Sequence, residues 1–182
     1  MSNVWFTSDF HFNHAKSIIF GNRPYENVED MNNGLINNYN KLVKHNDTVY
    51  FLGDFGFGDL ETLRKIRYKL KGKIHYILGN HCYKNHINRC AAWFSSMSDL
   101  KTISVNKQKI VLCHYAMRVW DGSHYNSWML YAHSHGKLES QGKSFDVGVD
   151  CWNYVPVSFD QVVEKMKTLP DNFNLVKKNE TT

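Results

Sequence analysis

The chain has 182 residues, of which 42% are hydrophobic and 14% are aromatic. This length supports one well-buried core and is too short for two ordinary domains with a linker. The formal net charge of +5 is modest and favours ordinary surface charge over a nucleic-acid groove. We therefore expect one domain over residues 1–170 and a flexible tail over residues 171–182.

The N-terminal residues and the cysteines indicate a protein that is not exported. The chain reaches Asp9 without a basic segment or an apolar segment before it, which argues against a signal peptide. No apolar stretch approaches the roughly 20 residues of a membrane helix. The four cysteines have no paired spacing, so neither a disulfide framework nor a CxxC zinc site is indicated. We expect a cytoplasmic protein with reduced thiols and no membrane contact.

The first half of the chain alternates short apolar strands with amphipathic helices. Apolar residues recur at helical spacing from 28 to 42, with Asn27 as the N-cap, and a second helix follows the N-cap Asp59. Strand, loop, helix, strand is the order of a parallel sheet, which places ligands beyond the carboxyl ends of its strands. The predicted strands, rich in β-branched and aromatic residues, span residues 4–8, 48–52 and 73–78.

The second half is richer in strands and predicts a second sheet. Two strands flank a turn at residues 106–108 and form a hairpin. Ser158 and Gln161 have the spacing of a capping box, so a last helix should begin there and stop before Pro170. The predicted strands of this half span residues 101–105, 109–113, 128–132 and 144–149.

Residue types that bind metals follow the ends of these predicted strands. Asp9 and His11 are separated by one residue, so in an extended segment both side chains would project to one side and could hold one ion. His133 and His135 repeat this spacing. A single histidine is more often a hydrogen-bonded group than a ligand, but here the candidates recur after one strand end after another. They are Asp9, His11, Asp54, Asn80, His114, His133 and His135.

Asp54 is the candidate for a ligand shared between two metal ions. A pair of divalent cations about 3.5–4 Å apart needs an anionic oxygen that touches both. Asp54 lies in a glycine-rich loop, where the backbone can turn sharply and a substrate can approach closely. The competing interpretation is that Asp54 is only a turn or cap residue.

Taken in order, these motifs resemble the signature of the calcineurin-like metallophosphoesterases, D-x-H, G-D, G-N-H, H and H-x-H. The resemblance implies a four-layer α/β/β/α sandwich of two mixed sheets flanked by helices. It also implies one metal on Asp9, His11 and His135, a second on Asn80, His114 and His133, and Asp54 as the bridge. In this family a metal-bridging hydroxide attacks phosphorus and the histidine of G-N-H faces the leaving group. This makes His81 and Asp54 the catalytic candidates.

Two positions depart from the family pattern. Ala132 stands where glycine is common, which an ordinary backbone tolerates. Cys82 stands where a carboxylate usually follows G-N-H. A carboxylate there would orient His81 and support its charged form, and a thiol does both poorly. The sequence therefore predicts the metal ligands more firmly than the acid role of His81.

The expected activity is metal-dependent hydrolysis of phosphate esters. A phosphodiester is favoured over a monoester because the chain is small and has no cap domain. Imidazole, carboxylate and amide ligands suit manganese, our first choice, and leave iron, zinc and nickel open. A phosphomonoesterase, a nuclease and a non-catalytic scaffold for protein binding are the alternatives. The candidate substrate contacts, for a nucleotide or nucleic acid among other phosphate esters, are His14, Arg23 and Asn80.

Overall fold

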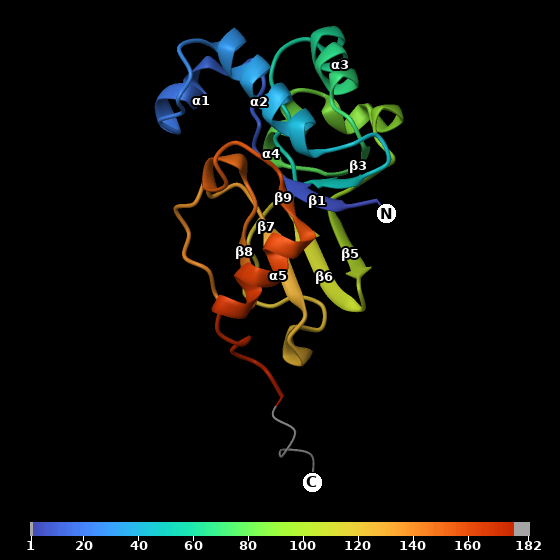
Figure 1. Cartoon of the computed structure of the whole chain (residues 1–182), viewed down its shortest axis with the longest axis vertical. Coiled ribbons are helices and arrows are strands. Elements are labelled where there is room, and N and C mark those ends of the chain that lie inside the picture. Colours follow the sequence, from blue (N-terminus) through green and yellow to red (C-terminus); the bar gives the residue numbers. More distant parts are fainter. Residues whose placement is uncertain (1, 177–182) are drawn as a thin grey trace.

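The computed structural model describes residues 2–176 and contains two β-sheets (Figure 1). The strands are β1 (Val4–Thr7), β2 (Thr48–Phe51), β3 (Lys73–Ile77), β4 (Ser96–Ser98), β5 (Leu100–Val105), β6 (Gln108–Cys113), β7 (Trp128–Tyr131), β8 (Ser144–Asp146) and β9 (Val157–Ser158). The first sheet has the order β4-β3-β2-β1-β9 and the second β5-β6-β7-β8. Strand β9 is antiparallel to β1, and β5 is antiparallel to β6, while the other pairs are parallel. The predicted α/β fold with two mixed sheets and flanking helices is confirmed.

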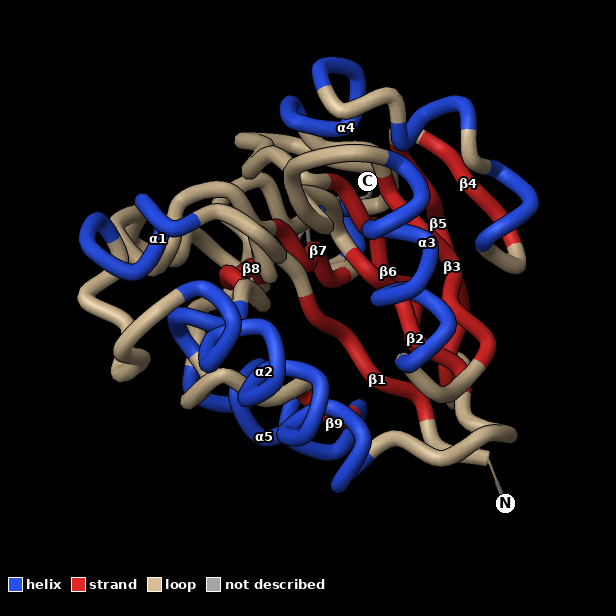
Figure 2. Tube along the Cα trace, turned by 90° about the horizontal axis from the view of Figure 1, so that it is seen from above, coloured by secondary structure: helices blue, strands red, loops and turns tan. Residues whose placement is uncertain are grey.

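The long helices begin where their caps were predicted. Helix α2 (Val28–Leu42) starts at Asn27, whose side chain accepts a hydrogen bond from the N–H of Asp30, and α3 (Leu60–Lys69) starts at Asp59. The apolar faces of both helices pack on the first sheet, and Figure 2 shows α2 alongside β1. Helix α5 (Phe159–Thr168) opens with the predicted capping box.

Alternation along the central strands divides the core into two clusters. In β1, Trp5 packs toward α2 and α3 while Phe6 faces the second sheet. In β2, Phe51 joins the helix side, and Leu52, the next residue, joins the space between the sheets. This alternation is the consequence of the two-residue period of a strand. Both faces of the first sheet are therefore buried, which leaves its strand ends to carry the polar groups.

Several short elements were not predicted from the sequence. They are helices α1 (Ala15–Phe20) and α4 (Asn80–Lys84) and strands β4 and β9. Elements this short have no measurable hydrophobic period, so only tertiary contacts define them. The strand predicted over residues 144–149 ends at Asp146, and a 3₁₀ turn follows over Val149–Cys151.

The start of the predicted flexible tail is attached to the second half of the molecule. The Asn172 side chain is 4% exposed and donates hydrogen bonds to the carbonyl oxygens of Ser123 and Ser127, at 2.9 and 3.0 Å. The Val176 N–H donates to the His124 carbonyl. The rest of that prediction, residues 177–182, lies outside the described residues. Within residues 2–176 no helix is long and apolar enough to cross a membrane.

Candidate metal centre

The predicted ligands meet at one edge of the molecule, beyond the carboxyl ends of β1, β2, β3, β6 and β7. Two groups of side chains have ligand atoms that all lie within 4.8 Å of one another. The first group is Asp9, His11 and His135, and the second is Asp54, His114 and His133. Residues more than a hundred positions apart in the sequence thus converge, as expected at the edge of an open α/β sheet.

The backbone that aims these ligands is not extended, contrary to the sequence prediction. Asp9 and His11 have φ angles of 58° and 51°, and His133 and His135 have 68° and 48°. Asp54, at 52°, is also in the left-handed region. Such conformations cost a non-glycine residue on the order of 1–3 kcal/mol and collect at functional sites. The paired spacing therefore brings ligands together through left-handed turns and not through strand alternation.

One carboxylate oxygen of Asp54 faces both groups. Its Oδ2 lies 3.9 Å from Nε2 of His11 in the first group and 3.5 Å from Nε2 of His114 in the second. Its Oδ1 accepts a hydrogen bond from the N–H of His81 at 3.0 Å. Burial opposes ionisation of Asp54, but hydrogen bonding and charge from His114 outweigh it and lower the pKa. Asp54 is thus an anionic oxygen in the position that a shared ligand needs.

Glycines make room for this carboxylate. A Cβ at Gly79 would collide with Oδ1 of Asp54, and a Cβ at Gly53 would lie 2.5 Å from Nδ1 of His114. Gly53 also has a φ of 96°, which other residues rarely adopt. The glycine of G-D and the glycine of G-N-H are therefore required by close packing around the ligands.

Two histidines are oriented so that Nε2 is left for a cation. Nδ1 of His114 lies 2.6 Å from the Leu52 carbonyl oxygen, to which it donates, so Nε2 is the position open to a second proton or to a cation. Burial lowers the pKa of His114, but the hydrogen bond to Asp54 and the charges of Asp9 and Asp54 outweigh it and raise the pKa, so a cation would replace the Nε2 proton that these carboxylates favour. That Nε2 lies 3.1 Å from Oδ1 of Asn80. Two acceptors at this distance need a proton or a metal ion between them. Nδ1 of His135 lies 2.7 Å from Asp150, which fixes that ring in the same way.

Asp9 has the unsatisfied oxygen that a cation would complete. Its side chain is fully buried, Oδ2 accepts from the His133 N–H, and Oδ1 has no hydrogen-bond partner. Burial raises the pKa of Asp9 to about 7. Burial lowers the pKa of His11 to about 3, which keeps that ring neutral. A buried carboxylate beside a neutral imidazole fits a divalent cation.

Metal binding should therefore be coupled to proton release from Asp9. At about pH 6 a bound cation should displace about one proton from this carboxyl, and affinity should rise up to about tenfold per pH unit before levelling above the Asp9 pKa of about 7. In chelator-treated protein, stability against unfolding should fall as pH rises, whereas metal affinity rises with pH. The extra stability of protonated Asp9 is present below its ordinary pKa of 3.8 and is lost as pH rises through about 7. Calorimetric titration in buffers of different ionisation enthalpy measures the proton count, and a count that is equal at about pH 6 and pH 8 would contradict the coupling.

The Arg23 side chain is bonded within the protein. Its side chain is fully buried, and its Nε and one terminal nitrogen both lie 2.8 Å from the Asp150 carboxylate. The guanidinium also donates to the carbonyl oxygens of Asp9 and Phe10. These bonds engage the guanidinium within the protein, while Arg23 also lines a pocket beside the site, and its contact with a substrate phosphate stays a prediction. Asp150 in turn holds His135, so Arg23 supports a candidate metal ligand.

Residues 2–163 match the family described as calcineurin-like phosphoesterase. The chain belongs to this family. It is 34% identical over 176 residues to the uncharacterized protein MJ1445 of Methanocaldococcus jannaschii, covering 90% of this chain and 91% of that protein. It is 26% identical over 200 residues to the gene 66 protein of Mycobacterium phage L5, covering 90% and 94%. The crystal structure of AQ665 from Aquifex aeolicus, a protein of unknown function, superposes with a TM-score of 0.69 at 21% identity, covering 91% of this chain and all of the other.

In this calcineurin-like phosphoesterase the departure at Cys82 has a local structural explanation. The buried Sγ accepts a hydrogen bond from the Gly79 N–H at 3.1 Å and lies 3.0 Å from the Tyr76 hydroxyl. Burial raises the pKa of this thiol, so it stays protonated. Cys82 thus closes the first turn of α4, while the His81 ring packs beside Phe57, with centroids 4.8 Å apart. Among the described residues the thiol makes no hydrogen bond to His81.

The remaining predicted site residues lie near the metal groups. Nε2 of His81 is 4.0 Å from Oδ2 of Asp54, and its side chain is 28% exposed. The His14 ring stacks on Phe57 at 4.1 Å and lines the adjoining pocket. Asn80 directs its Oδ1 at His114. The role of Asp150 was not predicted from the sequence, because its pairing with Arg23 spans 127 positions and has no local signal.

Proposed function

We propose that this calcineurin-like phosphoesterase hydrolyses phosphodiesters with a pair of divalent cations held by the two ligand groups. The observation that carries the proposal is the position of Asp54 Oδ2, within 4.0 Å of a ligand nitrogen from each group. A single-ion site would not need an anionic oxygen between two sets of ligands. The unpartnered, buried Oδ1 of Asp9 supports a bound cation in the first group.

Different side chains would hold the cations and supply the proton during hydrolysis. When bound, the ions act as Lewis acids and lower the pKa of water enough to supply hydroxide near neutral pH. Asp54 holds both positions at a fixed separation, while His114 and His135 are fixed by Leu52 and Asp150. His81 is partly exposed beside Asp54, where it can donate a proton to the departing oxygen, since imidazole is a suitable acid near neutral pH.

The charges around the site favour a diester over a monoester. The residues that line the adjoining pocket include two permanent cations, Arg23 and Lys137. Arg23 is paired with Asp150, so only the Lys137 charge remains to meet a second negative charge on the substrate. A monoester dianion carries one more negative charge than a diester, and guanidinium and ammonium groups are the side chains that pair with it. The imidazole, carboxylate and amide ligands leave the metal open among manganese, iron, zinc and nickel, with manganese the first to test.

The test is to purify the protein, count the metals per chain, and compare two chromogenic esters. We expect about two manganese ions per chain and a higher kcat/KM for bis-p-nitrophenyl phosphate than for p-nitrophenyl phosphate. A higher value for the monoester would overturn the diester preference alone. Less than about one ion per chain together with no hydrolysis would favour the scaffold alternative. Comparing dinucleotides with longer oligonucleotides then separates a small-molecule phosphodiesterase from a nuclease.

A further inference from the structure

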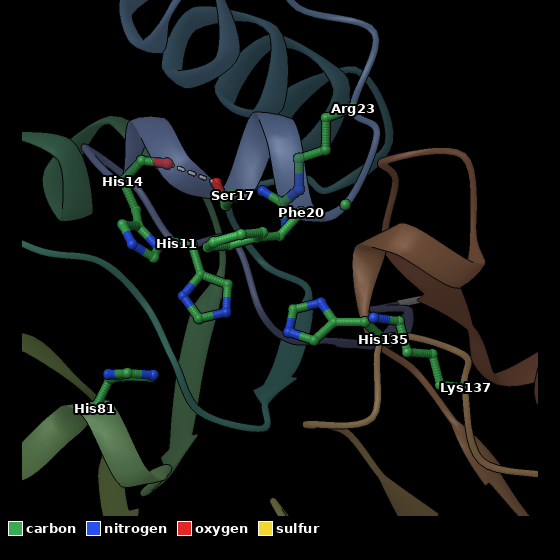
Figure 3. A pocket seen from close by; sticks show the side chains of 9 residues that line it. His11, His14, Ser17, Phe20, Arg23, His81, His135 and Lys137 are labelled. Carbon is green, nitrogen blue, oxygen red and sulfur yellow. Dashed lines mark hydrogen bonds between the residues drawn. The ribbon is translucent and has the colours of Figure 1, made fainter.

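A pocket opens beside the first ligand group, under the short helix α1 (Figure 3). Its volume is about 170 Å³, and its walls include the metal-site residues His11, His81 and His135. Helix α1 supplies Phe20 to the opposite wall. Figure 3 shows the Phe20 ring extending from α1 above His11 and His135, with His81 across the pocket. The pocket is therefore continuous with the proposed reaction site.

Phe20 is a large apolar side chain that is exposed to solvent at the edge of the pocket. It is 73% exposed, and its neighbour Ile19 is 78% exposed. Burying such a side chain would contribute roughly 1.5–3 kcal/mol to folding, yet the fold leaves both uncovered. Phe20 lines the pocket and Ile19 does not. An exposed ring at a site edge is a feature of ligand-binding surfaces.

Helix α1 has only six residues and is bonded at both ends. An isolated helix of this length does not persist in water. Here the Ser17 hydroxyl donates to the His14 carbonyl at 2.7 Å, and the Arg23 N–H donates to the Ile18 carbonyl at 2.9 Å. Arg23 is in turn fixed by Asp150. These bonds fix the backbone of α1 beside the pocket, which reduces the entropy lost when a ligand packs against the helix.

The position of His81 decides which part of the substrate enters. If His81 protonates the departing oxygen, the group on its side of the phosphorus is the leaving group. We propose that the pocket receives the leaving group and that Phe20 stacks on a flat aromatic ring carried by it. In this reaction water oxygen bonds to phosphorus, the P–O bond to the leaving group breaks, and that oxygen takes up a proton. The inference rests on the proposed function and adds the chemistry of the leaving group.

A nucleobase and a simple aryl ring share this chemistry, so the test includes both. The substrates are thymidylyl-thymidine, bis-p-nitrophenyl phosphate and glycerophosphoethanolamine, whose alcohols carry no ring. Phe20→Ala should lower kcat/KM about tenfold for the first two, as loss of one stacking contact does, and leave the third unchanged. Phe20→Trp should retain activity on both ring substrates. The ring substrate with the larger loss identifies the source of the ring.

Ile19→Ala is the matched control, because it removes an equally exposed apolar side chain from the same helix outside the pocket. Metal content and thermal unfolding should be the same in all these variants. If Phe20→Ala behaves like Ile19→Ala, or if the ringless diester is affected equally, the leaving-group assignment is wrong while the phosphodiesterase stands. If the wild-type protein hydrolyses none of the three, the proposed function itself fails.

Discussion

Replacing Asp54 by asparagine should lower kcat/KM for a phosphodiester about a thousandfold, equivalent to about 4 kcal/mol of transition-state stabilisation. The amide keeps the size of the side chain, and its oxygen can still accept the His81 N–H bond that Oδ1 makes at 3.0 Å. It lacks the negative charge that Oδ2 presents to His11 and His114. The variant should therefore fold normally but fail to hold two cations together.

The measurement combines metal counting with steady-state kinetics. Asp54→Asn should retain at most about one ion per chain after gel filtration, against about two in the wild type. Asp59→Asn is the matched control, since this aspartate lies in the same loop but is an exposed cap of α3, and asparagine caps equally well. Two tightly bound ions in Asp54→Asn would show that the bridge lies elsewhere.

Much of this arrangement could be predicted from the sequence, because its signals are local. Asn27 and Asp59 cap helices where the onset of the apolar period placed them. The metal-ligand candidates directly follow short apolar runs that predict strands. A parallel sheet brings the carboxyl ends of its strands to one edge. The order of the motifs then pointed to the family that residues 2–163 match. One implied set recurs as the first group, and the second group holds two residues of the other set, His114 and His133, together with Asp54. The metal-binding roles stay predictions.

What the sequence could not predict depends on distant contacts or on backbone angles. Asp and His are enriched among left-handed residues, but the spacing of Asp9 and His11 does not show that they adopt this conformation, which replaces the extended geometry expected for that spacing. The ion pair of Arg23 is made with a carboxylate 127 positions away, that of Asp150. Helix α1 is too short to show a period. Its exposed Phe20 is therefore recognised as a pocket wall only once the chain is folded.

Replacing Asp150 by asparagine should weaken binding of the cation held by Asp9, His11 and His135 by about 10–100-fold, as loss of a ligand-orienting group does. In the wild type Asp150 accepts from Nδ1 of His135 at 2.7 Å and from two nitrogens of Arg23 at 2.8 Å. Burial disfavours its charge, but the hydrogen bonds from His135 and Arg23 outweigh this and lower the pKa. The pairing is therefore complete above its ordinary pKa of 3.8 and is lost as pH falls below that value.

The dependence of kcat on manganese concentration separates a loss of His135 orientation from a loss of folding. If Asp150 orients His135, excess manganese should restore kcat to Asp150→Asn, because the ligands themselves are intact. Arg23→Lys should show the same metal dependence and also a lower free energy of unfolding, since lysine cannot make the bidentate pair that Arg23 makes in the interior. Arg64→Lys is the matched control, because its pair with Glu61 is half exposed and should change neither property. If Asp150→Asn retains both ions with wild-type affinity, the Arg23 and Asp150 pair serves only to hold α1 in place, and His135 needs no second partner to bind metal.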